Sequence, residues 1–193
     1  MENIENNTGI IKEKNDNKKE VLFYTDVISA FVVAVLAFCT RFVSWYGFFI
    51  GENAKSHLYR RFGPYGGIGF SNGEEIGFDR LSSRLETAKV LLTVCAVLFA
   101  LYIIVLVLQV TLPKIRNSFI PFVSGVLFYG TLLAAVVYGF LGAVGSAELY
   151  SNVESTVGIG WYAALVLSLI GLALTAAPTL VSNTIGKYLE DNR

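Results

Sequence analysis

Cysteine and histidine are scarce in this chain of 193 residues, which contains two cysteines and one histidine. Cys39 and Cys95 both fall inside long apolar runs, where a thiol behaves as a small apolar group. No cysteine lies between those runs to form a disulfide, and the sequence around His57 shows no spacing typical of metal ligands. We therefore expect no metal site and no cofactor.

Patterns typical of catalysis and of nucleic-acid binding are also missing. Glu74, Glu75 and Asp79 are close in sequence, but acidic residues in a polar loop usually form a solvated surface. The glycine-rich segment 63–73 lacks the lysine and hydroxyl ending of a phosphate-binding loop. Basic and acidic residues nearly balance in the same loop, so no nucleic-acid site is predicted. We expect a protein that is not an enzyme.

Charged residues are few, at 16%, whereas hydrophobic residues reach 54% and the mean hydropathy is +0.57. This composition is too apolar for a soluble domain of this length. Four apolar runs are each long enough to cross about 30 Å of hydrocarbon. The sequence therefore predicts an all-α membrane protein in which a bundle of four transmembrane helices occupies residues 22–50, 88–112, 120–144 and 157–181. The lipid bilayer is its first expected partner.

The polar segments define the remaining organisation. Residues 1–20 alternate asparagine, lysine and glutamate and are predicted to be disordered, because they cannot bury enough apolar surface. The transmembrane domain is expected at 21–182, with outer loops at 51–86 and 145–156 and a short tail at 183–193. The second outer loop contains Glu148 and Glu154 and no basic residue, so we expect both termini in the cytoplasm. We expect the plasma membrane rather than an organelle.

The first outer loop contains a pattern typical of a small hairpin. Asn72-Gly73 is a dipeptide favoured in tight hairpin turns, and short apolar-bearing runs flank it on both sides. The sequence therefore predicts a β-hairpin or small sheet resting on the outer ends of the helices. The residues of this loop that we predict to mediate assembly or interaction are Tyr65, Ile68, Phe70, Asn72 and Gly73.

Small residues recur every four positions in the third and fourth runs. Such stripes let helix backbones approach closely, which matters in lipid because the usual hydrophobic drive for association is absent. The stripes favour packing of the third helix on the fourth within one chain, with a dimer seam as the alternative. Their members are Thr131, Ala135, Gly139 and Ala143 in the third run, and Gly160, Ala164 and Ser168 in the fourth.

Aromatic residues gather near one end of two runs. Trp45 and Tyr46 lie near the end of the first run, and Trp161 and Tyr162 begin the fourth. In the predicted topology both pairs fall at the same outer interface, where amphipathic rings are expected at the level of the headgroups. We interpret these four residues as interface anchors.

Two ionisable residues fall inside the first run. Asp26 lies near its inner end and Arg41 near its outer third, about 22 Å apart along a helix, so they cannot pair. One interpretation is that each side chain extends to its nearer interface, and the other is that both belong to an ion path.

A resemblance to a known family rests on layout and on short motifs. Gly67-Ile68-Gly69-Phe70 is similar to the Gly-Leu-Trp core of the claudin first loop, and Arg84-Leu85 followed by Ala88 resembles that family's approach to its second helix. The segment 158–162 resembles the opening of its fourth helix. The chain thus resembles the claudin, peripheral-myelin-protein and amastin type of four-span protein, although its loop lacks their cysteines. The resemblance implies a four-helix bundle capped by a small outer sheet.

Two functions from different classes follow. The first is a structural role in surface organisation, cell contact or membrane-domain assembly through the first outer loop, which predicts a homo-oligomer. The second is an accessory subunit of a larger channel, transporter or respiratory complex, which predicts another membrane protein as partner. The residues of the first outer loop would make the contact in the structural role, whereas the spans would make it in the accessory subunit.

Overall fold

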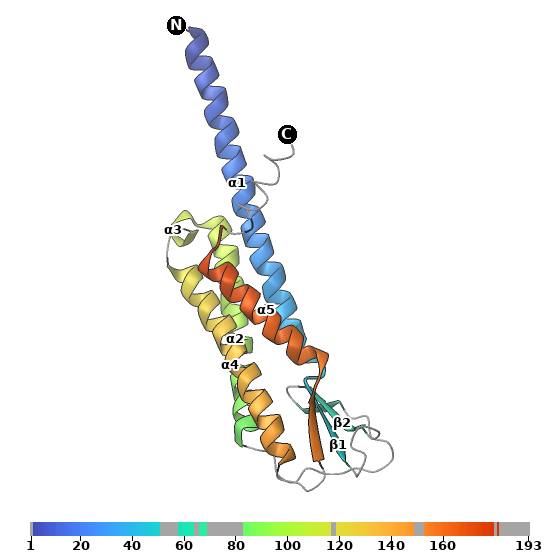
Figure 1. Ribbon diagram of the computed structural model, residues 1–193. Helices are drawn as coiled ribbons and strands as arrows, with labels where there is room; N and C mark the ends of the chain where they lie inside the picture. Colours follow the sequence, from blue (N-terminus) through green and yellow to red (C-terminus); the bar gives the residue numbers. More distant parts are fainter. Residues whose placement is uncertain are drawn as a thin grey trace.

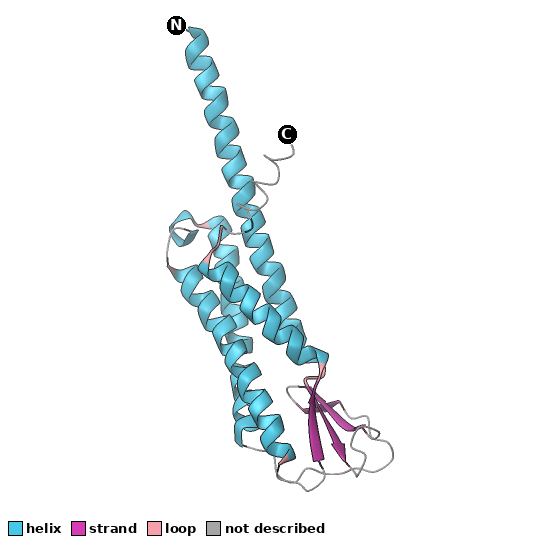
Figure 2. Cartoon of the chain, in the orientation of Figure 1, coloured by secondary structure: helices cyan, strands magenta, loops and turns pink. Residues whose placement is uncertain are grey.

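A computed structural model of the chain describes residues 2–50, 58–63, 66–68, 83–116, 119–148, 153–179 and 181. Four long helices form a bundle, and strands pack beside one end of it (Figure 1, Figure 2). We call this end the sheet end. At the opposite end, the short helix α3 (Pro113–Arg116) joins two of the long helices, and we call it the α3 end.

The four long helices confirm the predicted class of fold. They are α1 (Glu2–Cys39), α2 (Ser83–Thr111), α4 (Ile120–Ala147) and α5 (Ile159–Ala176). Each contains a stretch long and apolar enough to cross a membrane, which in α1 begins at Glu20. The chain is therefore a multi-pass membrane protein with a four-helix bundle and a small sheet.

Helix α1 differs from its predicted bounds at both ends. Residues 2–20, predicted to be disordered, continue the helix back to Glu2, as extending an existing helix costs far less than starting one. At the other end the helix stops at Cys39, followed by a 3₁₀ turn (Thr40–Phe42) and by strand β1 (Tyr46–Ile50). The prediction of one helix over 22–50 is thus wrong after Cys39. Aromatic residues in its last part favour a strand.

The strands form one antiparallel sheet in the order β3-β2-β1-β4. Strand β2 (Leu58–Gly63) and strand β3 (Gly66–Ile68) come from the first outer loop, and β4 (Val153–Val157) comes from the second. Tyr46 in β1 lies opposite Phe62 in β2 on one side and opposite Val157 in β4 on the other. The sheet therefore joins the two outer loops through β1.

Aromatic rings fill the middle of the bundle. The Phe38 ring of α1 stacks on Phe99 of α2 with 4.2 Å between centroids, and Phe99 contacts Phe128 of α4 at 5.6 Å. Tyr102 and Tyr129 continue this column with centroids 5.7 Å apart. The rings connect α1, α2 and α4 across a core that contains few polar groups.

The helices differ in length, and this difference positions the sheet. Helices α2 and α4 contain 29 and 28 residues, whereas α5 contains 18. At about 1.5 Å per residue, α5 is about 27 Å long and the other two are longer than 40 Å. In Figure 1 the longer helices extend past the start of α5, and the strands lie beside this extension.

Candidate functional site

The sheet is fixed to the bundle by the segment between α1 and β1. Trp45 is fully buried, and its indole Nε1 donates a hydrogen bond of 2.9 Å to the carbonyl oxygen of Thr40. The Thr40 hydroxyl in turn donates to the carbonyl of Ala37 at 2.7 Å. The Thr40 carbonyl also accepts a bond of 3.2 Å from the Val43 N–H, so two bonds hold the turn that follows α1. The chain therefore leaves the membrane span in a defined direction.

The junction between β4 and α5 packs against the same segment. The Gly158 N–H donates to the Trp45 carbonyl at 2.7 Å, and the Gly160 N–H donates to the Ser44 carbonyl at 3.2 Å. A Cβ atom at Gly160 would lie 2.8 Å from Cδ1 of Trp45 and 2.9 Å from the Ser44 oxygen. A Cβ at Gly158 would also overlap the Ser44 oxygen. Both positions therefore require glycine.

Strand β1 also contacts α4 through Tyr46. The Tyr46 phenol occupies the space beside Gly139, where any Cβ atom would collide with its hydroxyl. Tyr46 is 2% exposed, and within the described part of the chain its hydroxyl has no hydrogen-bond partner. Burial raises the pKa of this hydroxyl above its ordinary value. Phe48, two residues further along β1, is fully buried. The Tyr46 ring therefore forms a close contact between the sheet and α4.

The small-residue stripes lie mostly inside the protein. Thr131 is partly exposed, whereas the other predicted packing residues are buried, namely Ala135, Gly139, Ala143, Gly160, Ala164 and Ser168. The space beside Gly139 and Gly160 is occupied by Tyr46 and Trp45, so these two glycines receive rings from the sheet segment.

Three close contacts between helices use glycines outside the predicted stripes. A Cβ at Gly171 of α5 would collide with the Tyr129 ring of α4, and one at Gly125 would lie 2.6 Å from Oγ1 of Thr175. A Cβ at Gly142 would lie 2.8 Å from the Leu85 Cα on α2. A glycine inside an apolar span usually has a packing reason. The positions of these three glycines in the sequence could therefore have indicated close contacts between helices.

The four predicted interface anchors occupy different environments. Trp45 and Tyr46 are buried in the protein, which differs from the position predicted for an anchor in the headgroup layer. Trp161 is partly buried, and its Nε1 donates to the Val136 carbonyl at 2.9 Å. Tyr162 is 56% exposed, and its role as an anchor stays a prediction.

The predicted loop residues fall largely outside the described residues. Ile68 lies in β3, opposite Arg61 of β2. Tyr65, Phe70, Asn72 and Gly73, with the predicted Asn72-Gly73 turn, belong to segments that the structure does not describe.

The outer edge of β4 was not predicted, although Val153, Thr156 and Val157 give the segment a composition favourable to a strand. The bond from Gly158 to Trp45 makes these two residues a hydrogen-bonded pair, so Thr156 and Gly47 form the next such pair. The N–H and C=O groups of Ser155 and Val157 must then point away from β1. Among the described strands, β4 pairs with β1 alone.

Among the described residues near the sheet end, Arg41 lies beside two aromatic rings. The Arg41 guanidinium lies 4.7 Å from the Phe38 ring centroid and 5.4 Å from that of Phe42. No group of three histidine, cysteine or acidic side chains gathers among the described residues. Cys39 and Cys95 are both free thiols.

Comparisons with known proteins add no family. No protein-family model matches the chain, and no curated protein sequence matches it at a significant level.

Proposed function

We propose that this protein has a structural role in the membrane and assembles with copies of itself through the sheet. The observation that carries the proposal is that the outer edge of β4 pairs with no other described strand, on a sheet that is fixed to the bundle. An edge strand presents a row of unpaired backbone groups that can accept a strand from another chain. Here the groups directed away from β1 belong to Ser155 and Val157, and no described strand pairs with them.

The firm attachment of the sheet supports an assembly role. Trp45, Tyr46 and Phe48 are buried at the junction, and Gly158 and Gly160 bring the start of α5 against the same segment. A surface that is already ordered loses little conformational entropy when it binds. The sheet can therefore hold a second copy in a fixed orientation relative to the membrane.

The arrangement of the strands also supports the resemblance to claudin-like proteins. That resemblance implies a four-helix bundle capped by a small outer sheet, and here strands from both outer loops form one sheet beside such a bundle. We propose accordingly that the sheet end is the extracellular end of a plasma-membrane protein and that both termini are cytoplasmic.

Two proline variants of β4 test the edge directly. Ser155→Pro removes an N–H that points away from β1, a position where proline is tolerated in an edge strand. Thr156→Pro removes an N–H directed at Gly47 and should loosen the sheet itself. We expect Ser155→Pro to remain folded but to lose the self-associated species that the wild type forms in mild detergent, as measured by native mass spectrometry. Ser155→Ala is the matched control and should assemble normally.

The same measurement distinguishes the alternatives. Unchanged self-association of a folded Ser155→Pro variant would exclude the β4 edge as the contact. A wild type that is purified with one different membrane protein in fixed stoichiometry would favour the accessory-subunit function instead.

A further inference from the structure

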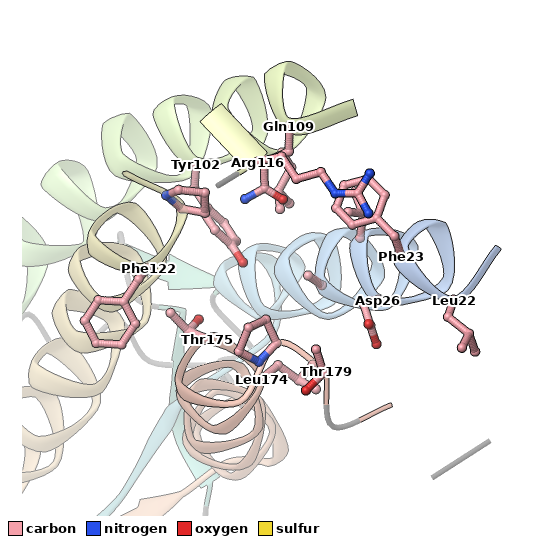
Figure 3. Close-up of a pocket in the computed structure, with 15 residues that line it drawn as sticks. Leu22, Phe23, Asp26, Tyr102, Gln109, Arg116, Phe122, Leu174, Thr175 and Thr179 are labelled. Carbon is pink, nitrogen blue, oxygen red and sulfur yellow. The ribbon is translucent and has the colours of Figure 1, made fainter. Parts of the chain in front are cut away.

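A cavity of about 460 Å³ lies at the α3 end, remote from the sheet. Figure 3 shows the side chains around it, which come from α1, α2, α3, α4 and the end of α5. Its deep wall includes Tyr102, Leu106 and Thr175, which are at most 8% exposed. Phe122 and Arg116 lie at an exposed rim. The cavity therefore closes toward the centre of the bundle and opens at the α3 end.

The two charged side chains of the lining lie toward the open end of the cavity. Asp26, Gln109 and Arg116 lie toward the open end, whereas Ala30 and Leu106 line deeper parts. Tyr102 lies seven residues before Gln109 on α2, which places it about 10 Å deeper in the bundle. The deep hydroxyl of Thr175 is already used, because it donates to the Gly171 carbonyl at 2.7 Å. This profile matches an amphiphile with a polar head at the rim and a hydrocarbon chain inside.

Arg116 provides a group that can recognise the head. Its guanidinium lies 3.6 Å from the centroid of the Phe23 ring. Stacking of this kind uses the face of the guanidinium and leaves its N–H groups directed outward in the plane. Within the described part of the chain, Arg116 makes this ring contact and no hydrogen bond. A planar fork of N–H donors is well suited to a phosphate.

The position of Arg116 indicates which phosphate it would meet. Arg116 follows the span that ends at Thr111 by five residues, so it lies at the boundary between hydrocarbon and headgroups. Basic groups between transmembrane helices at this level are typical lipid-headgroup sites. The carboxyl of Asp26 lines the same cavity, so the site contains one charge of each sign. This combination matches a headgroup with a phosphate and an ammonium.

We propose that the cavity binds one zwitterionic phospholipid from the surrounding leaflet. The phosphate contacts Arg116, and one acyl chain enters between α1 and α5 toward Leu106. A volume of about 460 Å³ is within the range of small-molecule sites, roughly 300 to 1,000 Å³. An apolar space of this kind is better filled by hydrocarbon than by water. This binding does not depend on the assembly role of the sheet.

The head contact is tested with Arg116→Gln and a matched control. Lys114→Gln removes a neighbouring exposed cation on α3 that does not line the cavity. After delipidation, each full-length protein is given phosphatidylethanolamine in detergent micelles, and bound lipid is counted by native mass spectrometry. We expect the wild type and Lys114→Gln to bind one molecule per chain. Arg116→Gln should bind about fivefold more weakly, as expected for loss of one basic contact.

The chain contact is tested by filling the cavity. Ala30→Leu adds bulk to the lining, whereas Ala100→Leu makes the same change on an exposed position of α2. We expect Ala30→Leu to lose the bound lipid while its helix content, measured by circular dichroism, stays equal to that of Ala100→Leu.

Several outcomes would overturn the proposal. These include a wild type that binds no lipid, equal binding by wild type and Arg116→Gln, or lipid retained by Ala30→Leu. If inorganic phosphate alone raises the unfolding temperature of the protein as much as phosphatidylethanolamine does, the cavity is a simple anion site instead. Lipid binding that appears only after removal of residues 182–193 would show that the tail of the chain occupies the cavity.

Discussion

The sheet end and the α3 end of the bundle are packed in opposite ways. At the sheet end, Trp45 and Tyr46 fill the space beside Gly160 and Gly139, and no added atom is accommodated there. At the α3 end, the same bundle encloses about 460 Å³ of open space beside Ala30. The comparison shows that the sheet end leaves no space for an added atom. The α3 end keeps a cavity within the same bundle.

The largest effect should come from removing the ring that fills the sheet end. Trp45→Ala deletes a fully buried side chain and its bond to the Thr40 carbonyl. We expect the free energy of unfolding to fall by about 3–5 kcal/mol. The exposed Tyr162→Ala should change it by less than about 0.5 kcal/mol. Unfolding in detergent, followed by circular dichroism, measures both, and equal effects would contradict the closed packing of Trp45.

A smaller effect is expected when bulk is added at the same end. Gly139→Ala places a methyl group against the Tyr46 phenol, and overpacking of this kind costs about 1–3 kcal/mol. Gly130 lies on the same helix with nothing within 4 Å of the added atom. Gly130→Ala should therefore be neutral or stabilise by up to about 1 kcal/mol, because alanine favours helix. Thermal unfolding measures the stability of the two variants. A Gly139→Ala variant more stable than Gly130→Ala would refute the close packing at Gly139.

The buried Tyr46 hydroxyl should make the sheet end sensitive to high pH. Its pKa is raised above the ordinary value of 10.0, so above this pH the unfolded chain loses a proton that the folded chain keeps. Stability from this group is complete below pH 10 and then decreases by about 1.4 kcal/mol per pH unit. Tyr46→Phe should remove this part of the decrease. Unfolding curves of both proteins between pH 9 and 11 test it, and identical slopes would argue against a buried hydroxyl.

The smallest effect is expected from adding bulk at the α3 end. Ala30→Leu extends into open space, so we expect the free energy of unfolding of the lipid-free protein to change by less than about 1 kcal/mol. Leucine at this position adds more atoms than alanine does at Gly139, yet it should lower the free energy of unfolding by less. If Ala30→Leu proves as damaging as Gly139→Ala, the two ends are equally packed.

Much of the bundle could be predicted from the sequence because hydropathy alone defines long apolar helices. The end of α1 could not be located in this way. The run 22–50 is predominantly apolar up to its last residue, and hydropathy alone does not distinguish a buried strand such as β1 from a buried helix. The strand β4 was missed because five residues between two helices give a weak signal.

The site residues show where local patterns stop being informative. The spacing of Gly139 and Gly160 predicted close packing but could not reveal that Trp45 and Tyr46 occupy the space. The cavity was not predicted, because it depends on how α1, α2 and α5 diverge, and no single segment encodes that angle. Asp26 and Arg116 are 90 residues apart in the sequence and line one cavity only in the fold.

The pairing of β1 with β4 has a consequence for how the protein is made. Strand β1 follows the first span and β4 immediately precedes the last, so β1 is synthesised long before its partner. During this interval, one edge of β1 lacks the strand that will cover it, which exposes the nascent chain to wrong pairing. The sheet can close only after β4 reaches the same side of the membrane as β1. Completion of the sheet is therefore impossible in a chain in which only one of α2 and α4 has crossed the membrane.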